Sequence, residues 1–160
     1  MNGFAQHNIT HLSASSLNVA AQELPLFVME RLLGWRSPTN AAMARGNAAE
    51  EGIHAGLLKP DMPVAECVAK AVAAFDAEMR FAGDPGREKE RELIPGYVEN
   101  GLQELRQYGV PTGYQEKISI QLDDVPVPVI GFIDWRFDQH GMVVDLKTTE
   151  RLPSSLSVAH

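Results

Sequence analysis

The feature that most constrains the fold is a change of hydrophobic period at Pro111. Before it, apolar residues recur at helical spacing, and after it they alternate every second position, as in strands with one buried face. The chain has 160 residues, enough for one domain with its own core and too few for two. We therefore expect a single α+β domain over 1–160, with a helical first two thirds packed on a small mixed β-sheet.

Four helical patterns precede Pro111. The stretch "SASSLNVAAQELPLFVMERLLG" predicts a serine-capped helix that is kinked or broken at Pro25 and stops at Gly34. The stretch "SPTNAAMARGNAAEEGIHAGLL" predicts a second helix with Ser37 as its N-cap. Two further helices are expected in "VAECVAKAVAAFDAEMRFAG" and in "GREKERELIPGYVENGLQELRQYG", the latter interrupted near Pro95.

Three strands are expected after Pro111, in "YQEKISIQL", "VPVIGFIDWRF" and "MVVDLKT". Their short connections favour an antiparallel meander. The final "LPSSLSVAH" begins another helix about one turn before the sequence ends. We therefore expect the chain to be a fragment of its domain.

The second hairpin brings three charged residues together. A turn through Gln139-His140, or through all four residues 138–141, places Phe137 opposite Met142, whereas a bulge at Gly141 would shift this register. Counting back, Asp134 lies opposite Asp145, and Lys147 follows on the same face. The other face is apolar and is expected to be buried; it consists of Ile133, Trp135, Phe137, Met142, Val144 and Leu146.

Two facing carboxylates repel each other unless one is protonated or a cation lies between them. A divalent ion such as Mg²⁺ or Mn²⁺ suits paired carboxylates and leaves positions for water and phosphate. Lys147 is placed to orient a water molecule or to offset charge on a phosphate. The alternative is an exposed charged strand face with an ion pair.

Charge, cysteine content and apolar patterning argue against several classes of protein. The net charge of −7 argues against a broad basic face that binds nucleic acid by counterion release alone. The only cysteine is Cys67, so the chain forms no intrachain disulfide and no cysteine cluster. No apolar run approaches the roughly 18 residues of a membrane helix, and the N-terminus lacks a secretory signal pattern. A cytoplasmic protein without membrane contact is expected.

The motif "RGNAAE", followed much later by "GFIDWRF" and "MVVDLKTT", resembles the PD-(D/E)XK nuclease superfamily, in its RecB-like and phage-type exonuclease branch. The opening "HLSASSLNVAAQELPLFVMERLLG" is similar to the first helix of that branch. The resemblance implies a restriction-endonuclease-like α/β core. Family members continue into a further helix and a final strand, so the resemblance implies a core that is incomplete at the C-terminus.

The resemblance also implies roles for individual residues. Glu50 would be the helix-borne acid, Asp134 the first strand carboxylate, and Asp145 and Lys147 the D-x-K pair; all four would be catalytic. The metal would be held by Glu50, Asp134, Asp145 and the backbone carbonyl of Leu146. His54 is expected beside the site or at the surface. No iron–sulfur cluster is expected, because Leu24-Pro25 stand where relatives carry a cysteine.

The implied function is Mg²⁺- or Mn²⁺-dependent DNA exonuclease activity in recombination, repair or phage DNA processing, within a bacterial or phage-infected cell. Its partners would be DNA and a recombination or repair protein or a second copy of the chain. Arg45, Arg136 and Arg151 are candidate phosphate contacts, or else surface ion-pair residues. Two alternatives remain: a catalytically silent nuclease-fold scaffold or DNA-binding module, and an unrelated helical interaction protein with a coincidental D-x-K. If the chain is a fragment, as expected, the resemblance does not imply that this fragment is active by itself.

Overall fold

The structure, a computed structural model, describes residues 3–35 and 38–149. The described residues form an α+β fold with six α-helices and a small mixed sheet of four strands. They divide into two compact units, the first comprising residues 3–35 and 115–133 and the second residues 38–114 and 134–149. The predicted helix in "LPSSLSVAH" lies outside the described residues.

The first unit contains α1 (Gly3–Gln6), β1 (Leu12–Ser13), α2 (Ala14–Gln22), α3 (Leu24–Phe27) and the π-helix η1 (Val28–Leu32). The predicted serine cap is Ser13, whose side chain accepts from the Ser16 backbone N–H while the Ser16 hydroxyl caps the Ser13 N–H. The predicted break is confirmed, because α2 ends at Gln22 and Pro25 lies in the first turn of the separate helix α3.

The sheet is organised around β3 (Val129–Phe137), which pairs with β1, β2 (Gly113–Ile120) and β4 (Met142–Val144). It runs parallel to β1, with Leu12 opposite Val129, and antiparallel to β4. The mixed sheet agrees with the prediction. The two-residue β1 was not predicted, and β4 is shorter than the predicted "MVVDLKT".

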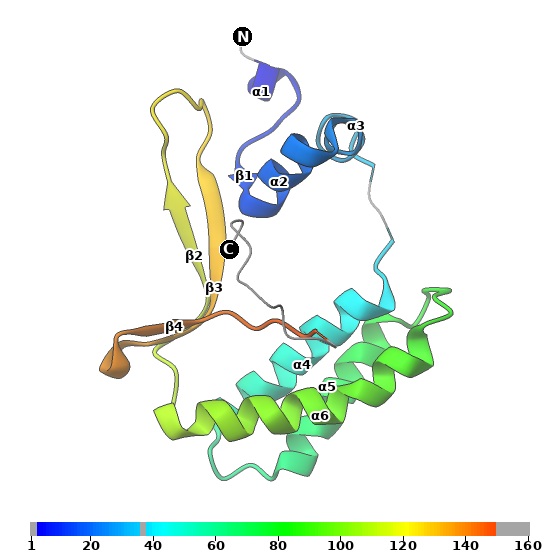
Figure 1. The fold of residues 1–160 in the computed structure, drawn as a ribbon, viewed down its shortest axis with the longest axis vertical. Helices are drawn as coiled ribbons and strands as arrows, with labels where there is room; N and C mark the ends of the chain where they lie inside the picture. Colours follow the sequence, from blue (N-terminus) through cyan, green and yellow to red (C-terminus); the bar gives the residue numbers. More distant parts are fainter. Residues whose placement is uncertain (1–2, 36–37, 150–160) are drawn as a thin grey trace. The chain divides into compact units, whose positions relative to one another are not determined.

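The second unit is built on α4 (Ala41–Leu58), α5 (Val64–Glu78) and α6 (Arg87–Leu105), each of which contacts the other two (Figure 1). The short 3-10 helices η2 (Arg106–Tyr108) and η3 (Asp138–His140) follow α6 and β3. Large side chains buried in this unit come from the helices and from the end of β3, namely Ile53, Leu57, Phe75, Met79, Ile94, Leu102, Trp135 and Phe137. The second half of β3 therefore belongs to the core of the helical unit.

Two helix predictions are corrected. The N-cap of α4 is Asn40, whose side chain accepts from the Met43 backbone N–H at 2.9 Å; Ser37 lies outside the described residues. The helix α6 runs without interruption through Pro95. Proline removes one helical hydrogen bond, but Ile94 and Val98 on either side of it are fully buried. Burial of this face keeps the helix continuous.

Close approach of the three helices depends on glycines. A Cβ atom at Gly52 would lie 2.8 Å from the Cβ of Ala71 and 2.9 Å from the backbone oxygen of Cys67. A Cβ at Gly101 on α6 would lie 2.3 Å from the Cδ1 atom of Ile53. Since real side chains do not approach this closely, the position of Gly52 admits only glycine at the present separation of α4 and α5, whereas a side chain at Gly101 would require the buried Ile53 side chain to move.

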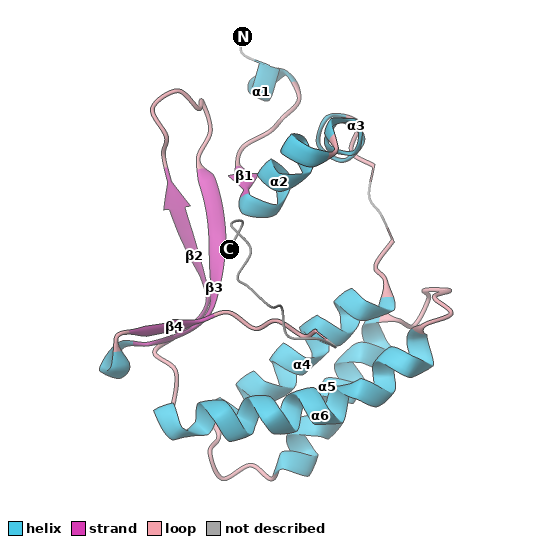
Figure 2. Cartoon of the chain, in the orientation of Figure 1, coloured by secondary structure: helices cyan, strands magenta, loops and turns pink. Residues whose placement is uncertain are grey.

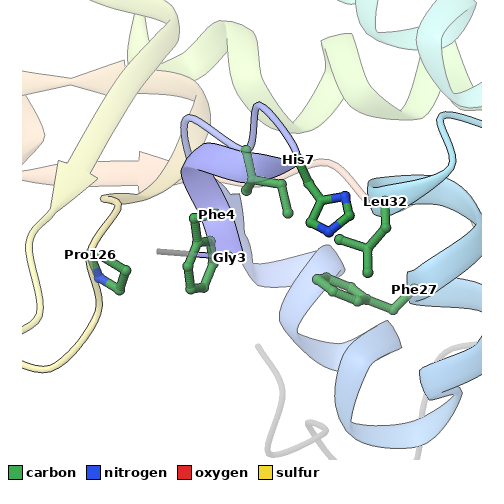
Figure 3. Close-up of a pocket in the computed structure, with 7 residues that line it drawn as sticks. Gly3, Phe4, His7, Phe27, Leu32 and Pro126 are labelled. Carbon is green, nitrogen blue, oxygen red and sulfur yellow. The ribbon is translucent and has the colours of Figure 1, made fainter. Parts of the chain in front are cut away.

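The first unit also contains an apolar pocket of about 430 Å³. Its walls come from α1, α3, η1 and the loop before β3, and include Phe4, His7, Phe27, Leu32 and Pro126 (Figure 3). None of the predicted site residues lines it. Within the described residues, no helix combines the length and the apolar character needed to cross a lipid bilayer.

The glycine packing is testable with a matched pair of substitutions. Gly52→Ala should destabilise the protein by roughly 1–2 kcal/mol, because the cost of overpacking exceeds the gain in helix propensity. Gly96→Ala, on an exposed part of α6 with nothing within 4 Å of the added Cβ, should stabilise it by up to about 1 kcal/mol. Urea unfolding measures both. Equal stabilisation by the two substitutions would contradict the packing.

Candidate functional site

The predicted hairpin register is confirmed. Phe137 lies opposite Met142 and Trp135 opposite Val144 in the antiparallel β3–β4 pair. The connection uses all four residues 138–141, and Gly141 adopts the left-handed conformation (φ 57°, ψ 34°) at the end of η3. Glycine takes this conformation without a steric cost, so the loop closes without a bulge that would shift the strands.

The register separates the two faces of the hairpin as predicted. Trp135 and Phe137 are fully buried, and Met142, Val144 and Leu146 pack against the same core. Asp134 is half-buried, while the side chains of Asp145 and Lys147 are each 59% exposed. The charged residues therefore alternate with the core residues along both segments.

Asp134 connects β3 to the segment that follows β4. Its Oδ2 atom accepts the backbone N–H of Leu146 at 2.7 Å. A carboxylate that accepts a backbone N–H is held in a defined orientation, and such charge-assisted bonds are stronger than neutral ones. The side chain of Asp134 is therefore fixed beside the backbone of residues 145 and 146.

Asp145 and Lys147 form an ion pair with each other. The Lys147 ammonium lies 2.9 Å and 2.8 Å from the two carboxylate oxygens of Asp145. Because both side chains are exposed, this pair contributes little to stability. It does, however, place a cation directly beside Asp145, one of the two aspartates that were expected to repel each other. Lys147 therefore neutralises that carboxylate in the structure as it stands.

Tyr114 lies beside Glu50 of α4 and is also reached by the weaker electrostatic effect of Asp134. The Tyr114 side chain forms a hydrogen bond with Glu50, and both Glu50 and Asp134 act electrostatically on its hydroxyl. Burial and then the charge of Glu50 raise the pKa of Tyr114 well above its ordinary value, with smaller contributions from Glu51 and Asp134. Tyr114 therefore remains a neutral hydroxyl donor facing two acidic residues from different elements.

His54 lies one helical turn after Glu50 and belongs to the same cluster. Its ring stacks on Tyr114 at 3.5 Å between centroids, and its Nδ1 atom lies 3.3 Å from the Trp135 indole N–H. An indole only donates, so Nδ1 is the acceptor and the neutral ring carries its proton on Nε2. Burial lowers the pKa of His54. His54 is thus a neutral ring that contacts Tyr114 and Trp135, one helical turn from Glu50.

The arginines have structural partners. Arg45 is buried, pairs with Glu90, donates to the Thr148 carbonyl at 2.8 Å and lies 4.9 Å from the centre of the Tyr97 ring. Arg136 pairs with Asp138 at 2.6 Å at the surface, and Arg151 lies outside the described residues. Arg45 is therefore an internal anchor that holds the segment after β4 against α4. In Figure 2 this segment is the loop that runs from β4 toward α4.

The predicted metal ligands are all oxygen donors, the chemistry that Mg²⁺ and Mn²⁺ prefer. They lie in one compact unit: Glu50 from α4, Asp134 from β3, and Asp145 and Leu146 from the segment after β4. Over residues 3–35 and 38–149, no group of three or more His, Cys, Asp or Glu side chains is arranged to hold a metal ion. Water and substrate oxygens would have to complete the coordination, as is usual for Mg²⁺.

Sequence reasoning missed Tyr114 and the contact between Trp135 and His54. Tyr114 was assigned to a strand, but nothing in the sequence set the register of that strand against β3, because the loop between them spans eight residues, 121–128. The register near Tyr114 is set by Thr112, whose backbone N–H donates to the Arg136 carbonyl at 2.7 Å. The only available signal was an aromatic residue at the start of a strand.

We compared the chain with protein-family models, with curated proteins and with solved structures, and none of the three comparisons gave a match.

Because Arg45 is buried and the Arg136–Asp138 pair is exposed, replacing Arg45 should cost more folding stability than replacing Arg136. Arg45→Met should destabilise the protein by about 3 kcal/mol, because it leaves the nearly buried Glu90 carboxylate with only the exposed and more distant ammonium group of Lys89. Arg136→Met breaks an exposed pair and should cost less than about 1 kcal/mol. Urea unfolding of the two variants measures this. Similar small losses would show that Arg45 is not an anchor.

Proposed function

We propose that this chain is a Mg²⁺- or Mn²⁺-dependent deoxyribonuclease that hydrolyses phosphodiester bonds at DNA ends. One observation carries the proposal: half-buried Asp134 is tied to the backbone N–H of Leu146, on the face of the hairpin opposite the core, while Tyr114 links it to Glu50. The restriction-endonuclease-like core and a role in recombination, repair or phage DNA processing belong to the same proposal.

The chain's own residues would act as follows. Glu50, Asp134 and Asp145 offer carboxylate oxygens to a divalent ion, and Leu146 offers its carbonyl. Bound there, the ion would polarise a phosphoryl oxygen and lower the pKa of a water molecule. Lys147 keeps an ammonium group beside Asp145, where it can offset negative charge on the phosphate. Tyr114 orients Glu50 by hydrogen bonding.

A second candidate is a catalytically silent nuclease-fold scaffold or DNA-binding module. It is favoured by the Asp145–Lys147 ion pair, which neutralises Asp145 without a metal. This candidate predicts DNA binding that does not depend on a divalent ion.

Metal binding separates the two candidates. The nuclease proposal predicts that Mn²⁺ binds the full chain in isothermal titration calorimetry. Asp134→Asn should weaken this binding by at least about 100-fold, because mutating residues that only support a metal ligand already lowers metal affinity by about 10–100-fold. Asp138→Asn is the matched control, because Asp138 is an exposed acid in the hairpin loop. It should leave binding unchanged. Equal affinity in the wild type and Asp134→Asn would overturn the nuclease proposal.

Cleavage tests the proposed reaction. End-labelled linear DNA should be degraded in the presence of Mg²⁺ or Mn²⁺ while covalently closed circles remain intact. Lys147→Ala should lower the rate by about 100-fold or more without preventing DNA binding, if its ammonium acts mainly on charge that builds up in the transition state. A Lys147→Ala variant with wild-type activity would contradict this role.

A further inference from the structure

A second pocket lies beside the candidate site and takes no part in the proposed chemistry. Its volume is about 240 Å³, and it is lined by Glu51, His54, Leu58, Lys59, Met62 and Lys70. The lining comes from the second half of α4, from the turn after it and from α5, all within the second unit. The pocket is smaller than those that hold drug-sized ligands, and suits a single flat ring system.

His54 connects this pocket to the candidate site. Tyr114 covers one face of the imidazole at 3.5 Å but does not line the pocket, so a different part of the ring is presented to it. The Trp135 N–H fixes the ring through Nδ1. A ring held in place by a stack and a hydrogen bond offers a pre-organised surface for stacking.

The charges around the pocket suit a nucleotide. Lys59 and Lys70 are exposed, and neither ammonium group has a hydrogen-bond or ion-pair partner within residues 3–35 and 38–149. Together they outnumber the one acidic residue of the lining, Glu51. Leu58 is 51% exposed and Met62 is nearly buried, and both add apolar surface. Flexible ammonium groups around an apolar floor suit phosphates flanking a stacked base.

We infer that this pocket between α4 and α5 binds one unpaired nucleobase, so that the chain selects single-stranded DNA or frayed DNA ends. His54 and Glu50 are four residues apart on α4 and lie on the same face, about 6 Å apart along the axis. A base held against His54 therefore places its sugar-phosphate close to Glu50. A base inside the pocket cannot remain paired. The inference rests on the proposed function for its link to cleavage, although base binding itself is independent of it.

Binding in the presence of a chelator tests the inference without any contribution from metal or cleavage. Fluorescence anisotropy of an internally labelled short single strand should give a dissociation constant about tenfold lower than that of a blunt duplex of the same length. Ala55→Leu fills the pocket and should weaken single-strand binding by roughly tenfold. Equal affinity for single strand and duplex would overturn the inference.

A pair of double charge reversals provides the matched comparison. Lys59→Glu/Lys70→Glu should weaken single-strand binding by about tenfold or more and reduce its salt dependence. Lys89→Glu/Lys117→Glu makes the same change in net charge outside the pocket lining and should change binding by less than about twofold. If both double variants lose single-strand affinity equally, the loss reflects overall charge alone, and the inference of a base-binding pocket is overturned. If Ala55→Leu fails to fold, this comparison still decides the question.

The outcomes separate the inference from the proposed function. Preferential single-strand binding that depends on the pocket, without Mn²⁺-dependent cleavage of any DNA, supports the pocket and rejects the nuclease. Mn²⁺-dependent cleavage that is equally fast on duplex and single strand, and unchanged in the pocket variants, supports the nuclease and rejects the pocket.

Discussion

The antiparallel pairing of β3 with β4 is the interaction on which the candidate site depends. Because Phe137 lies opposite Met142, Trp135 and Phe137 enter the core of the helical unit while Asp134 lies on the opposite face. A shift of one residue would exchange the two faces and bury charged side chains at a large cost in free energy. The burial of two large aromatic side chains therefore fixes the position of the acidic residues.

The packing of the helices positions α4, which carries Glu50, relative to the hairpin. Close packing at Gly52 and Gly101 holds α4 against α5 and α6, and buried Arg45 ties α4 to α6 through Glu90 and to the segment after β4 through Thr148. At Gly46, one turn before Glu50, an added Cβ would lie 3.3 Å from the Thr148 hydroxyl. An alanine there would require the Thr148 side chain to shift by a few tenths of an ångström, so Gly46 keeps α4 in close contact with the segment that carries Asp145 and Lys147.

Much of this could be predicted from local sequence. The hairpin register followed from strand alternation and loop length, and the helices followed from periodicity. The continuity of α6 could not be predicted in this way, because burial of Ile94 and Val98 outweighs the local helix-breaking effect of Pro95. Tyr114 was missed because its position opposite Glu50 depends on the pairing of segments separated by a long loop. Arg45 was expected to be a phosphate contact or a surface ion-pair residue. Its burial was not predicted, because its partners, Glu90 and Thr148, are distant in sequence.

The proposed site differs from a mere charged surface in one respect: Glu50 and Asp134, from a helix and a strand, both act on the hydroxyl of Tyr114. Tyr114 is 37% exposed, and a phenylalanine there would stack on His54 without bringing a hydroxyl group to Glu50. The hydroxyl of Tyr114 gains a role if Glu50 must be held toward the hairpin. This is the physical basis for treating Glu50 as part of the site.

Paramagnetic broadening by Mn²⁺ tests this account most directly. In an NMR titration of the isotopically labelled chain at substoichiometric Mn²⁺, the amide resonances of Glu50, Asp134 and Leu146 should broaden together, because one ion near the Tyr114 cluster lies close to all three. The exposed acidic pair Asp123-Asp124 provides the internal comparison and should be unaffected at the same concentration. Broadening confined to Asp123-Asp124, or none near Asp134, would contradict the account.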